Sequence, residues 1–149
     1  MATECSSGWS NVITWFIVAI GWYAVHRATL SRERRKEQRE ATQKAIEEIK
    51  QIEKSALDFH MANGHSQQEA DTLTSRIDRI LRLIQRPPLK ALEAPVMPMV
   101  KFRKSITLTN FDSSGFSTQH AESELLYAIR CATDDFTTAI ETQRDLKIP

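Results

Sequence analysis

Glycine and cysteine are scarce in this chain of 149 residues, and both shortages narrow the choice of fold. The sequence has four glycines and two cysteines, Cys5 and Cys131, which lie far apart. Two such cysteines, without a CxxC pattern, predict neither a structural disulfide nor a zinc site. Aromatic residues are few beyond the first 25 positions, whereas good helix formers dominate the middle of the chain. The composition therefore favours an all-α fold.

Catalytic and ligand-binding motifs are missing as well. The sequence contains no Walker loop, no GxSxG, no HExxH and no dinucleotide fingerprint. None of its four histidines has a histidine or cysteine partner three or four positions away. The adjacent carboxylates Asp134 and Asp135 would point in different directions on a helix. We therefore expect no enzymatic activity, no metal and no cofactor, and no small-molecule substrate is evident.

Basic residues are absent from the first 26 positions and concentrated directly after them. Residues 1–26 carry one formal charge, Glu4, whereas residues 27–86 hold thirteen Lys and Arg against ten Asp and Glu. The net charge of the chain is only +1, so it gives no global electrostatic argument for nucleic acid as a partner. Six basic residues follow Val25 within fifteen positions: Arg27, Arg32, Arg34, Arg35, Lys36 and Arg39.

An apolar run precedes these basic residues. Between Val12 and Val25 only Thr14 and Gly21 are not clearly apolar. A helix that begins at Trp9 would be about 26 Å long, at the short end of what crosses a hydrocarbon core of about 30 Å. We predict a transmembrane helix over residues 9–26, with these side chains in the span: Trp9, Val12, Ile13, Trp15, Phe16, Ile17, Val18, Ile20, Trp22, Tyr23 and Val25.

A signal peptide and a buried or interfacial helix remain open as alternatives. A signal peptide needs a positive N-terminal region and a small-residue cleavage site, and the sequence provides neither. A helix that is apolar on all faces needs a large protein around it. The positive-inside rule predicts a short external tail over residues 1–8 and a cytoplasmic location, at the inner membrane, for everything after Arg27. The six basic side chains can contact anionic headgroups or form a solvated helix face.

A helical hairpin is predicted after the basic run. The chain has neither proline nor glycine from Ala28 to Met61, and residues 27–44 lack an apolar stripe, as in a polar stalk. A capping box, Ser66 to Glu69, begins a second helix that ends before Pro87. The two helices form a hairpin over residues 45–86, with an apolar seam of Ile49, Ile52, Phe59, Leu73, Ile77, Ile80 and Ile84. We expect a solvated outer side with Arg76, Arg79, Arg82 and Arg86, and a surface for an acidic partner or nucleic acid is the alternative.

The last third of the chain begins with a proline-rich linker over residues 87–98, which has room for one short helical turn. Residues 99–110 read as helix or strand, and the lack of a partner strand favours a helix. A final amphipathic helix is predicted from Thr118 to Leu146, with Leu125, Ile129 and Phe136 on its apolar face. Residues 99–149 would form a second, smaller helical unit.

This layout of anchor, basic stalk and helical domain resembles small single-pass membrane proteins of bacteria, of the kind found as effectors or accessory proteins in phage-defence operons. The resemblance rests on architecture and transfers no functional residue. The predicted span makes membrane lipid a partner, and the small helical core favours completion by a protein partner or a second copy. We expect an interaction protein that docks a cytosolic partner or self-associates at the membrane. The alternative is an effector that perturbs the membrane and is restrained or triggered by its cytoplasmic helices.

Overall fold

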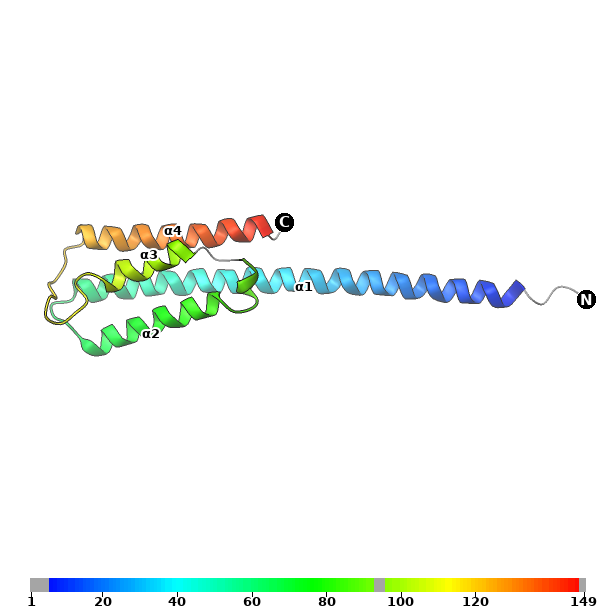
Figure 1. Ribbon diagram of the computed structural model, residues 1–149, viewed down its shortest axis with the longest axis horizontal. Coiled ribbons are helices and arrows are strands. Elements are labelled where there is room, and N and C mark those ends of the chain that lie inside the picture. Colours follow the sequence, from blue (N-terminus) through cyan, green and yellow to red (C-terminus); the bar gives the residue numbers. More distant parts are fainter. Residues whose placement is uncertain (1–5, 93–95, 148–149) are drawn as a thin grey trace, which may run out of the picture. The chain divides into compact units, whose positions relative to one another are not determined.

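The computed structural model describes residues 6–92 and 96–147, without the side chains of residues 6–12, 91–92 and 147. It contains the helices α1 (Ser6–Met61), α2 (Gln67–Ile84), α3 (Val96–Thr107) and α4 (Glu124–Lys147), with a short 3₁₀ helix, η1 (Leu89–Leu92), between α2 and α3 (Figure 1). No strand occurs in the part of the chain so described. The prediction of an all-α fold is confirmed, and residues 99–107 are helical.

The chain divides into two compact units, residues 1–37 and residues 38–149. The first contains the apolar run, where every described side chain from Ile13 to Val25 is exposed. Trp9 and Val12 lie among the residues whose side chains are not described, and the first five residues of the predicted external tail also lie outside the description. In the described residues, no helix contains an 18-residue stretch apolar enough to cross a membrane.

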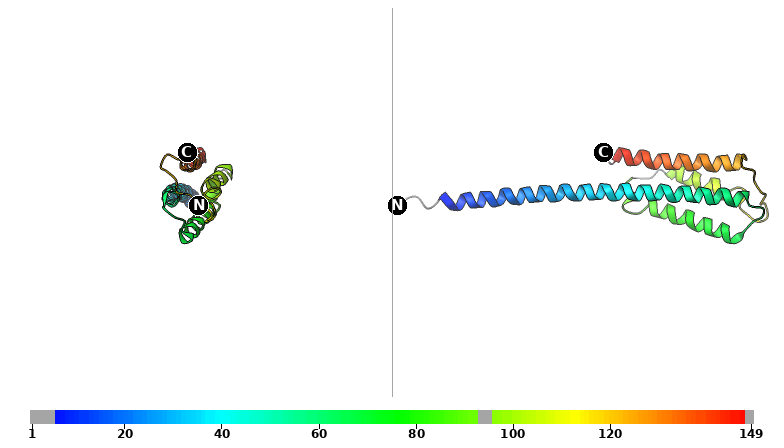
Figure 2. Two further views of the ribbon diagram at one scale, coloured as in Figure 1. Left: turned by 90° about the vertical axis from the view of Figure 1, so that its left-hand side faces the viewer. Right: turned by 180° about the vertical axis from the view of Figure 1, so that it is seen from behind.

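The second unit is an antiparallel bundle around one core. Figure 1 shows that the later part of α1, then α2, α3 and α4 run in alternating directions, and Figure 2 shows the same four helices end-on. The structure buries nine of the ten predicted seam residues: Ile49, Ile52, Phe59, Leu73, Ile77, Ile80, Ile84, Ile129 and Phe136. Leu125 is half-buried against the same cluster. Spacings of three and four residues place these side chains on one face of each helix, and burying them drives the packing.

Local signals define the ends of α2 well. The Ser66 side chain accepts a hydrogen bond from the backbone N–H of Glu69 at 3.4 Å, so Ser66 is the N-cap, as predicted. The helix ends at Ile84, shortly before Pro87 and Pro88. The linker that follows contains η1, the short helical turn for which the sequence left room.

The C-terminal helices differ from the prediction in two respects. They do not form a second unit, because Phe102, Ile106, Leu126 and Phe136 belong to the same buried cluster as the hairpin seam. In addition, α3 begins at Val96, inside the predicted linker. Pro98 is accommodated because it lies in the first turn of the helix, where backbone N–H groups have no intrahelical acceptor.

The beginning of α4 also differs from the prediction. The helix starts at Glu124 rather than Thr118, because residues 118 and 119 are bonded to the end of α1. The Thr118 hydroxyl donates to the carbonyl of Ala62 at 2.9 Å, and the Gln119 N–H donates to the carbonyl of His60 at 2.9 Å. The Ser123 hydroxyl then accepts from the N–H of Leu126 at 3.3 Å and caps the helix.

The seam makes a direct stability prediction. Ile49→Asp and Ile80→Asp each place an unpaired carboxylate at a position that is at most 1% exposed. We expect each to lower the free energy of unfolding by several kcal/mol, of the order of the whole stability of a small domain. The measurement is thermal melting of the full chain in mild detergent, with circular dichroism as the readout.

Arg39→Asp is the matched control, since Arg39 is exposed and precedes the seam. It should change the stability by less than about 0.5 kcal/mol. Equal losses for all three variants would show that the distinction between seam and stalk is mistaken.

Candidate interaction surfaces

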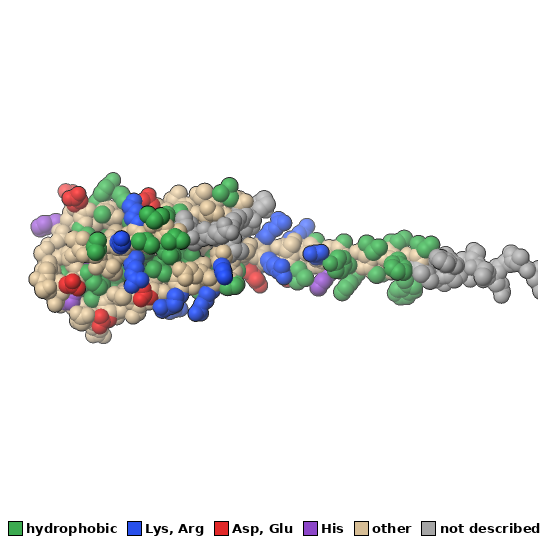
Figure 3. Space-filling view, viewed as in Figure 1, with side chains coloured by type: hydrophobic (Ala, Val, Ile, Leu, Met, Phe, Trp, Pro, Cys, Tyr) green, Lys and Arg blue, Asp and Glu red, His purple; other side chains and the backbone are tan. Residues whose placement is uncertain are grey.

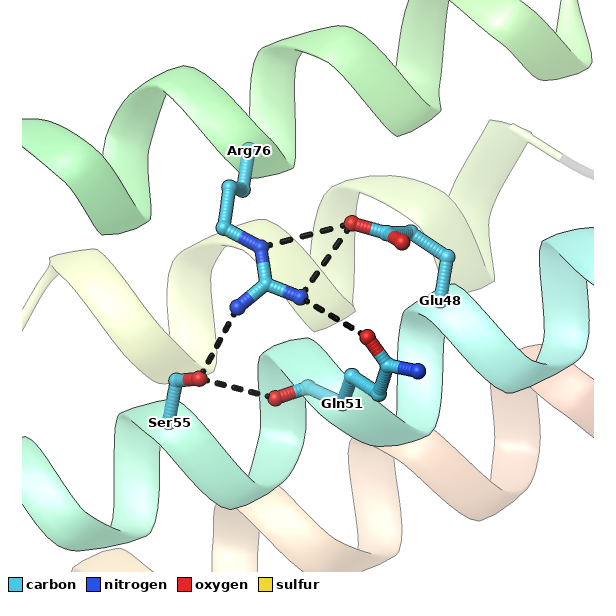
Figure 4. A network of polar contacts seen from close by, with 4 residues as sticks. All are labelled: Glu48, Gln51, Ser55 and Arg76. Atoms are coloured by element: carbon cyan, nitrogen blue, oxygen red, sulfur yellow. Dashed lines mark hydrogen bonds and ion pairs between the residues drawn. The ribbon is translucent and has the colours of Figure 1, made fainter.

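An arginine fork joins α1 to α2 (Figure 4). The guanidinium of Arg76 donates to a Glu48 carboxylate oxygen from Nε at 3.3 Å and from Nη2 at 3.2 Å. It also donates to the hydroxyl of Ser55 at 3.0 Å and to the amide oxygen of Gln51 at 3.4 Å. The fork geometry suits arginine, because its planar donors serve several acceptors at once. Arg76 therefore belongs to the helix interface and not to the solvated outer side predicted for it.

The ion pair between Arg76 and Glu48 is partly exposed to water, which limits how much it stabilises the fold. The side chains of Arg76 and Glu48 are 29% and 37% exposed, so water screens their attraction and the pair stabilises the fold only modestly. Each of the three guanidinium nitrogens of Arg76 donates to helix α1. We therefore assign the fork to the register of the hairpin and not to ligand binding.

A buried histidine, His60, lies at the end of the bundle where α1 and α3 end. His60 is fully buried, with its Nε2 atom 3.2 Å from the carbonyl of Ile106 and its Nδ1 atom 3.3 Å from the side-chain nitrogen of Asn110. The carbonyl must accept and the amide nitrogen must donate, so the ring is neutral with its proton on Nε2. Asn110 has a φ of 56°, a left-handed conformation that asparagine tolerates better than most residues.

Aromatic rings surround this histidine and hold the loop between α3 and α4. Phe59 contacts the rings of His65, Phe111 and Phe116 at centroid distances of 5.7, 5.3 and 5.5 Å. The Nε2 atom of His65 lies 3.0 Å from the carbonyl of Phe111. Among the four histidines, His60 and His65 are thus structural residues. No local pattern indicates this role, because the carbonyl groups to which the two rings bond lie 46 positions further along the chain.

An apolar groove lies between α3 and α4 on the outside of the bundle. It has a volume of about 560 Å³ and is lined by Val100, Leu108, Leu125, Ala128 and Ala132, among others. Leu108 is 75% exposed, and the ion pair of Lys101 with Asp135 bridges the two helices at the rim. An apolar floor with a charged rim is the usual form of a groove that receives a helix.

Chemical sites are absent from the described residues. No group of three potential metal ligands occurs among them, and none of their buried side-chain nitrogen and oxygen atoms lacks a hydrogen-bond partner. The open space beside Arg76 is lined by Asp58 and Glu69, among others.

Burial of His60 makes the stability of the bundle depend on pH. Burial lowers the pKa of His60 below its usual value of 6.5, because desolvation disfavours the charged ring. The unfolded chain therefore binds a proton more readily than the folded chain. The stabilisation is fully present above about pH 6.5 and is lost as the pH falls from there through the folded-state pKa. We expect melting temperature to decrease across this window, and the decrease to be smaller in His60→Gln.

Two comparisons show whether the pH dependence comes from His60 and not from another titratable group. Burial raises the pKa of Glu53, with the Asp134 carboxylate adding to the effect, so Glu53 contributes a pH dependence of opposite sign. The difference between the parent and His60→Gln cancels this contribution. His120→Gln, at an exposed position, should retain the parent's pH dependence, and a parent-like slope in His60→Gln would contradict the assignment.

Comparison of the chain with protein-family models, with curated proteins and with solved structures finds no match. The exposed apolar run, the groove and the distribution of charge are the features of this chain that bear on its function. The first two define a candidate anchor and a candidate docking surface, each on a different compact unit of the chain.

Proposed function

We propose that this chain is a single-pass membrane-anchored protein whose helical unit docks a protein partner at the inner face of the membrane. The observation that carries the proposal is the run from Ile13 to Val25, which contains no charged residue and leaves every side chain exposed. Its large hydrophobic side chains are between 55% and 74% exposed. A helix that is apolar on all faces calls for a bilayer or a protein interior around it.

The length of the run limits how it can lie in a bilayer. Residues 13–25 give about 20 Å of helix, and inclusion of residues 9–12 gives about 26 Å. Both are shorter than a hydrocarbon core of about 30 Å, so the bilayer must thin locally or flanking side chains must extend the span. The Trp22 and His26 rings stack at 5.2 Å, and the Arg27 guanidinium lies 5.9 Å from the centre of the Tyr23 ring. Such amphipathic side chains favour the headgroup layer.

The groove between α3 and α4 supports the second half of the proposal. A protein partner, or a second copy of the chain, would place a helix against Leu108, Leu125 and Ala128, with Lys101 and Lys104 at the rim. The six basic residues between Arg27 and Arg39 support the orientation, since the positive-inside rule places such a run in the cytoplasm.

Carbonate extraction tests the anchor. Membranes from cells that make the full chain should retain it after an alkaline wash, because exposed apolar side chains in the hydrocarbon region resist extraction. Ile17→Asp with Ile20→Asp places two carboxylates in the run and should release the protein. Quantitative release of the parent chain would remove the basis of the proposal.

A single substitution tests the groove. Leu108→Glu places a charge on its apolar lining, and because Leu108 is 75% exposed the fold should lose less than about 0.5 kcal/mol. We expect partner recovery to fall about tenfold or more. Recovery is measured by affinity purification in mild detergent with quantitative mass spectrometry.

Tyr127→Glu is the matched control, since Tyr127 is 67% exposed on α4 but does not line the groove. Parent-like recovery with Leu108→Glu, or an equal loss with both variants, would count against the groove as the docking surface.

Exchange of the span separates this proposal from the membrane-perturbing alternative. An anchor can be replaced by another apolar helix of similar length, because hydrophobicity alone holds it in the bilayer. We expect a leucine–alanine span in place of Val12–Val25 to keep partner recovery, with no depolarisation of the membrane by either chain. Depolarisation by the parent that the exchange abolishes would identify an effector.

A further inference from the structure

The charges of the helical unit are strongly segregated. Residues 79–104 hold seven Lys and Arg against one acidic residue, Glu93, whereas residues 112–145 hold two against seven. The net charge of the whole chain conceals this separation. Figure 3 shows the Lys and Arg side chains gathered over α2 and α3, with exposed hydrophobic side chains between them.

Part of this surface lies at one end of the unit, which we name the basic end. It consists of Arg82, Leu83, Arg86, Lys90, Val96 and Met97. Leu83, Val96 and Met97 are 48%, 63% and 78% exposed. No described carboxylate lies within ion-pair distance of Arg82, Arg86 or Lys90. Exposed cations without a described carboxylate partner therefore lie beside exposed aliphatic side chains at this end of the unit.

The antiparallel hairpin determines which end of the unit this is. Arg76 contacts Glu48, Gln51 and Ser55, so α2 runs back along α1 and its last turn lies beside the beginning of the unit. Leu89 of η1 is buried in the same cluster as Ala45. The basic end is therefore the end at which the chain enters the unit from the apolar run (Figure 1).

Distance along the chain makes a membrane surface accessible to this end. Twelve residues, 26–37, connect the apolar run to the unit. They are helical, so they span at most about 18 Å. The headgroup layer extends about 5–7 Å beyond the hydrocarbon core, which leaves about 12 Å to be closed by tilt and by long arginine and lysine side chains.

The geometry points to an anionic lipid surface as the ligand of the basic end. This inference rests on the proposed anchor and adds a second contact between protein and membrane. Cations near an anionic leaflet bind its headgroups, and adjacent aliphatic side chains enter the interface. Nucleic acid is disfavoured because α2, η1 and α3 expose no aromatic side chain on which a base could stack, Phe102 being fully buried.

The contact has a specific consequence for the groove. The last turn of α2 and the first turn of α3 would be held against the lipid by Arg86 and Met97. Leu108 and Leu125 lie at the opposite end of the unit, where α3 ends and α4 begins. That part of the groove stays accessible to a protein while the basic end is on the membrane.

A fluorophore at the basic end tests the inference in the full chain. We would attach an environment-sensitive nitrobenzoxadiazole label to Met97→Cys, with Cys5 and Cys131 replaced by serine, and reconstitute the protein in vesicles. The vesicles contain phosphatidylcholine alone or with phosphatidylglycerol. Emission should shift to shorter wavelength only in the anionic vesicles, and high salt should reverse the shift by screening the charges.

Charge reversal provides the decisive comparison. When Arg82→Glu, Arg86→Glu and Lys90→Glu are combined, the ratio of docked to free unit should fall by at least about two orders of magnitude. Loss of each cation removes about a factor of five near an anionic surface, and the added carboxylates are repelled by it. Lys50→Glu, Lys54→Glu and Arg130→Glu combined are the matched control. They make the same change of net charge at exposed positions outside the basic end and should leave the shift unchanged. Because Lys50 and Arg130 lie near Glu53, circular dichroism is used to check that this control variant is folded.

The other outcomes overturn the inference in distinguishable ways. Equal emission in both kinds of vesicle, with the protein still resistant to carbonate extraction, would refute lipid docking and leave the anchor standing. A shift that persists in the charge-reversed variant would show that the cations are not involved. If soluble polyglutamate causes the emission shift in neutral vesicles, the surface binds an acidic protein instead. If the shift depends on the number of protein molecules per vesicle, the surface binds a second copy of the chain. Loss of the parent from the vesicles would refute the anchor itself.

Discussion

The apolar seam of α1 is the constraint on which the helical unit depends. Ala45, Ile49, Ile52 and Ala56 recur at alternating spacings of four and three and are all fully buried. A stripe of this kind excludes water only when other helices cover it along its whole length. Helix α2 covers one side of the stripe, where Arg76 donates to Glu48. Helix α4 covers the other side, where the charges of Asp134 and Arg130 act on the Glu53 carboxyl group. Helix α3 then completes the core from the opposite corner with Phe102 and Ile106.

The parts of this fold that follow from local sequence were predictable, and those fixed by distant contacts were not. The ends of α2 depend on Ser66 and on Pro87, both within a few residues of the helix, and the sequence therefore identifies them. The start of α4 depends on the carbonyl groups of His60 and Ala62, more than fifty residues away, which bind residues 118 and 119 and keep them out of the helix. The groove was likewise invisible in the sequence, because it forms only where α3 packs on α4.

The same distinction explains why Arg76 and Arg82 have different roles although both lie in one stripe of arginines. Arg76 lies opposite Glu48 and Ser55 and is used to join two helices. Arg82 lies nearly two turns later, near the end of α2, where it lines an open space together with Asp78 and Met99. The Asp78 carboxylate there pairs with Arg103 and not with Arg82. Periodicity predicts that arginines share a face, whereas only the packed structure shows which of them the fold already uses.

Exposed hydrophobic surface is what remains after the core has been formed, and its distribution is informative. Nine of the large hydrophobic side chains with high exposure lie between Ile13 and Val25, and most of the others lie at the basic end or along the groove. Isolated exposed hydrophobic residues are ordinary, but grouped ones indicate contact with another apolar phase. The run from Ile13 has no charge, the basic end has only cations, and the groove rim has both signs. Under the proposed function, these three compositions would suit hydrocarbon, anionic headgroups and a protein partner respectively.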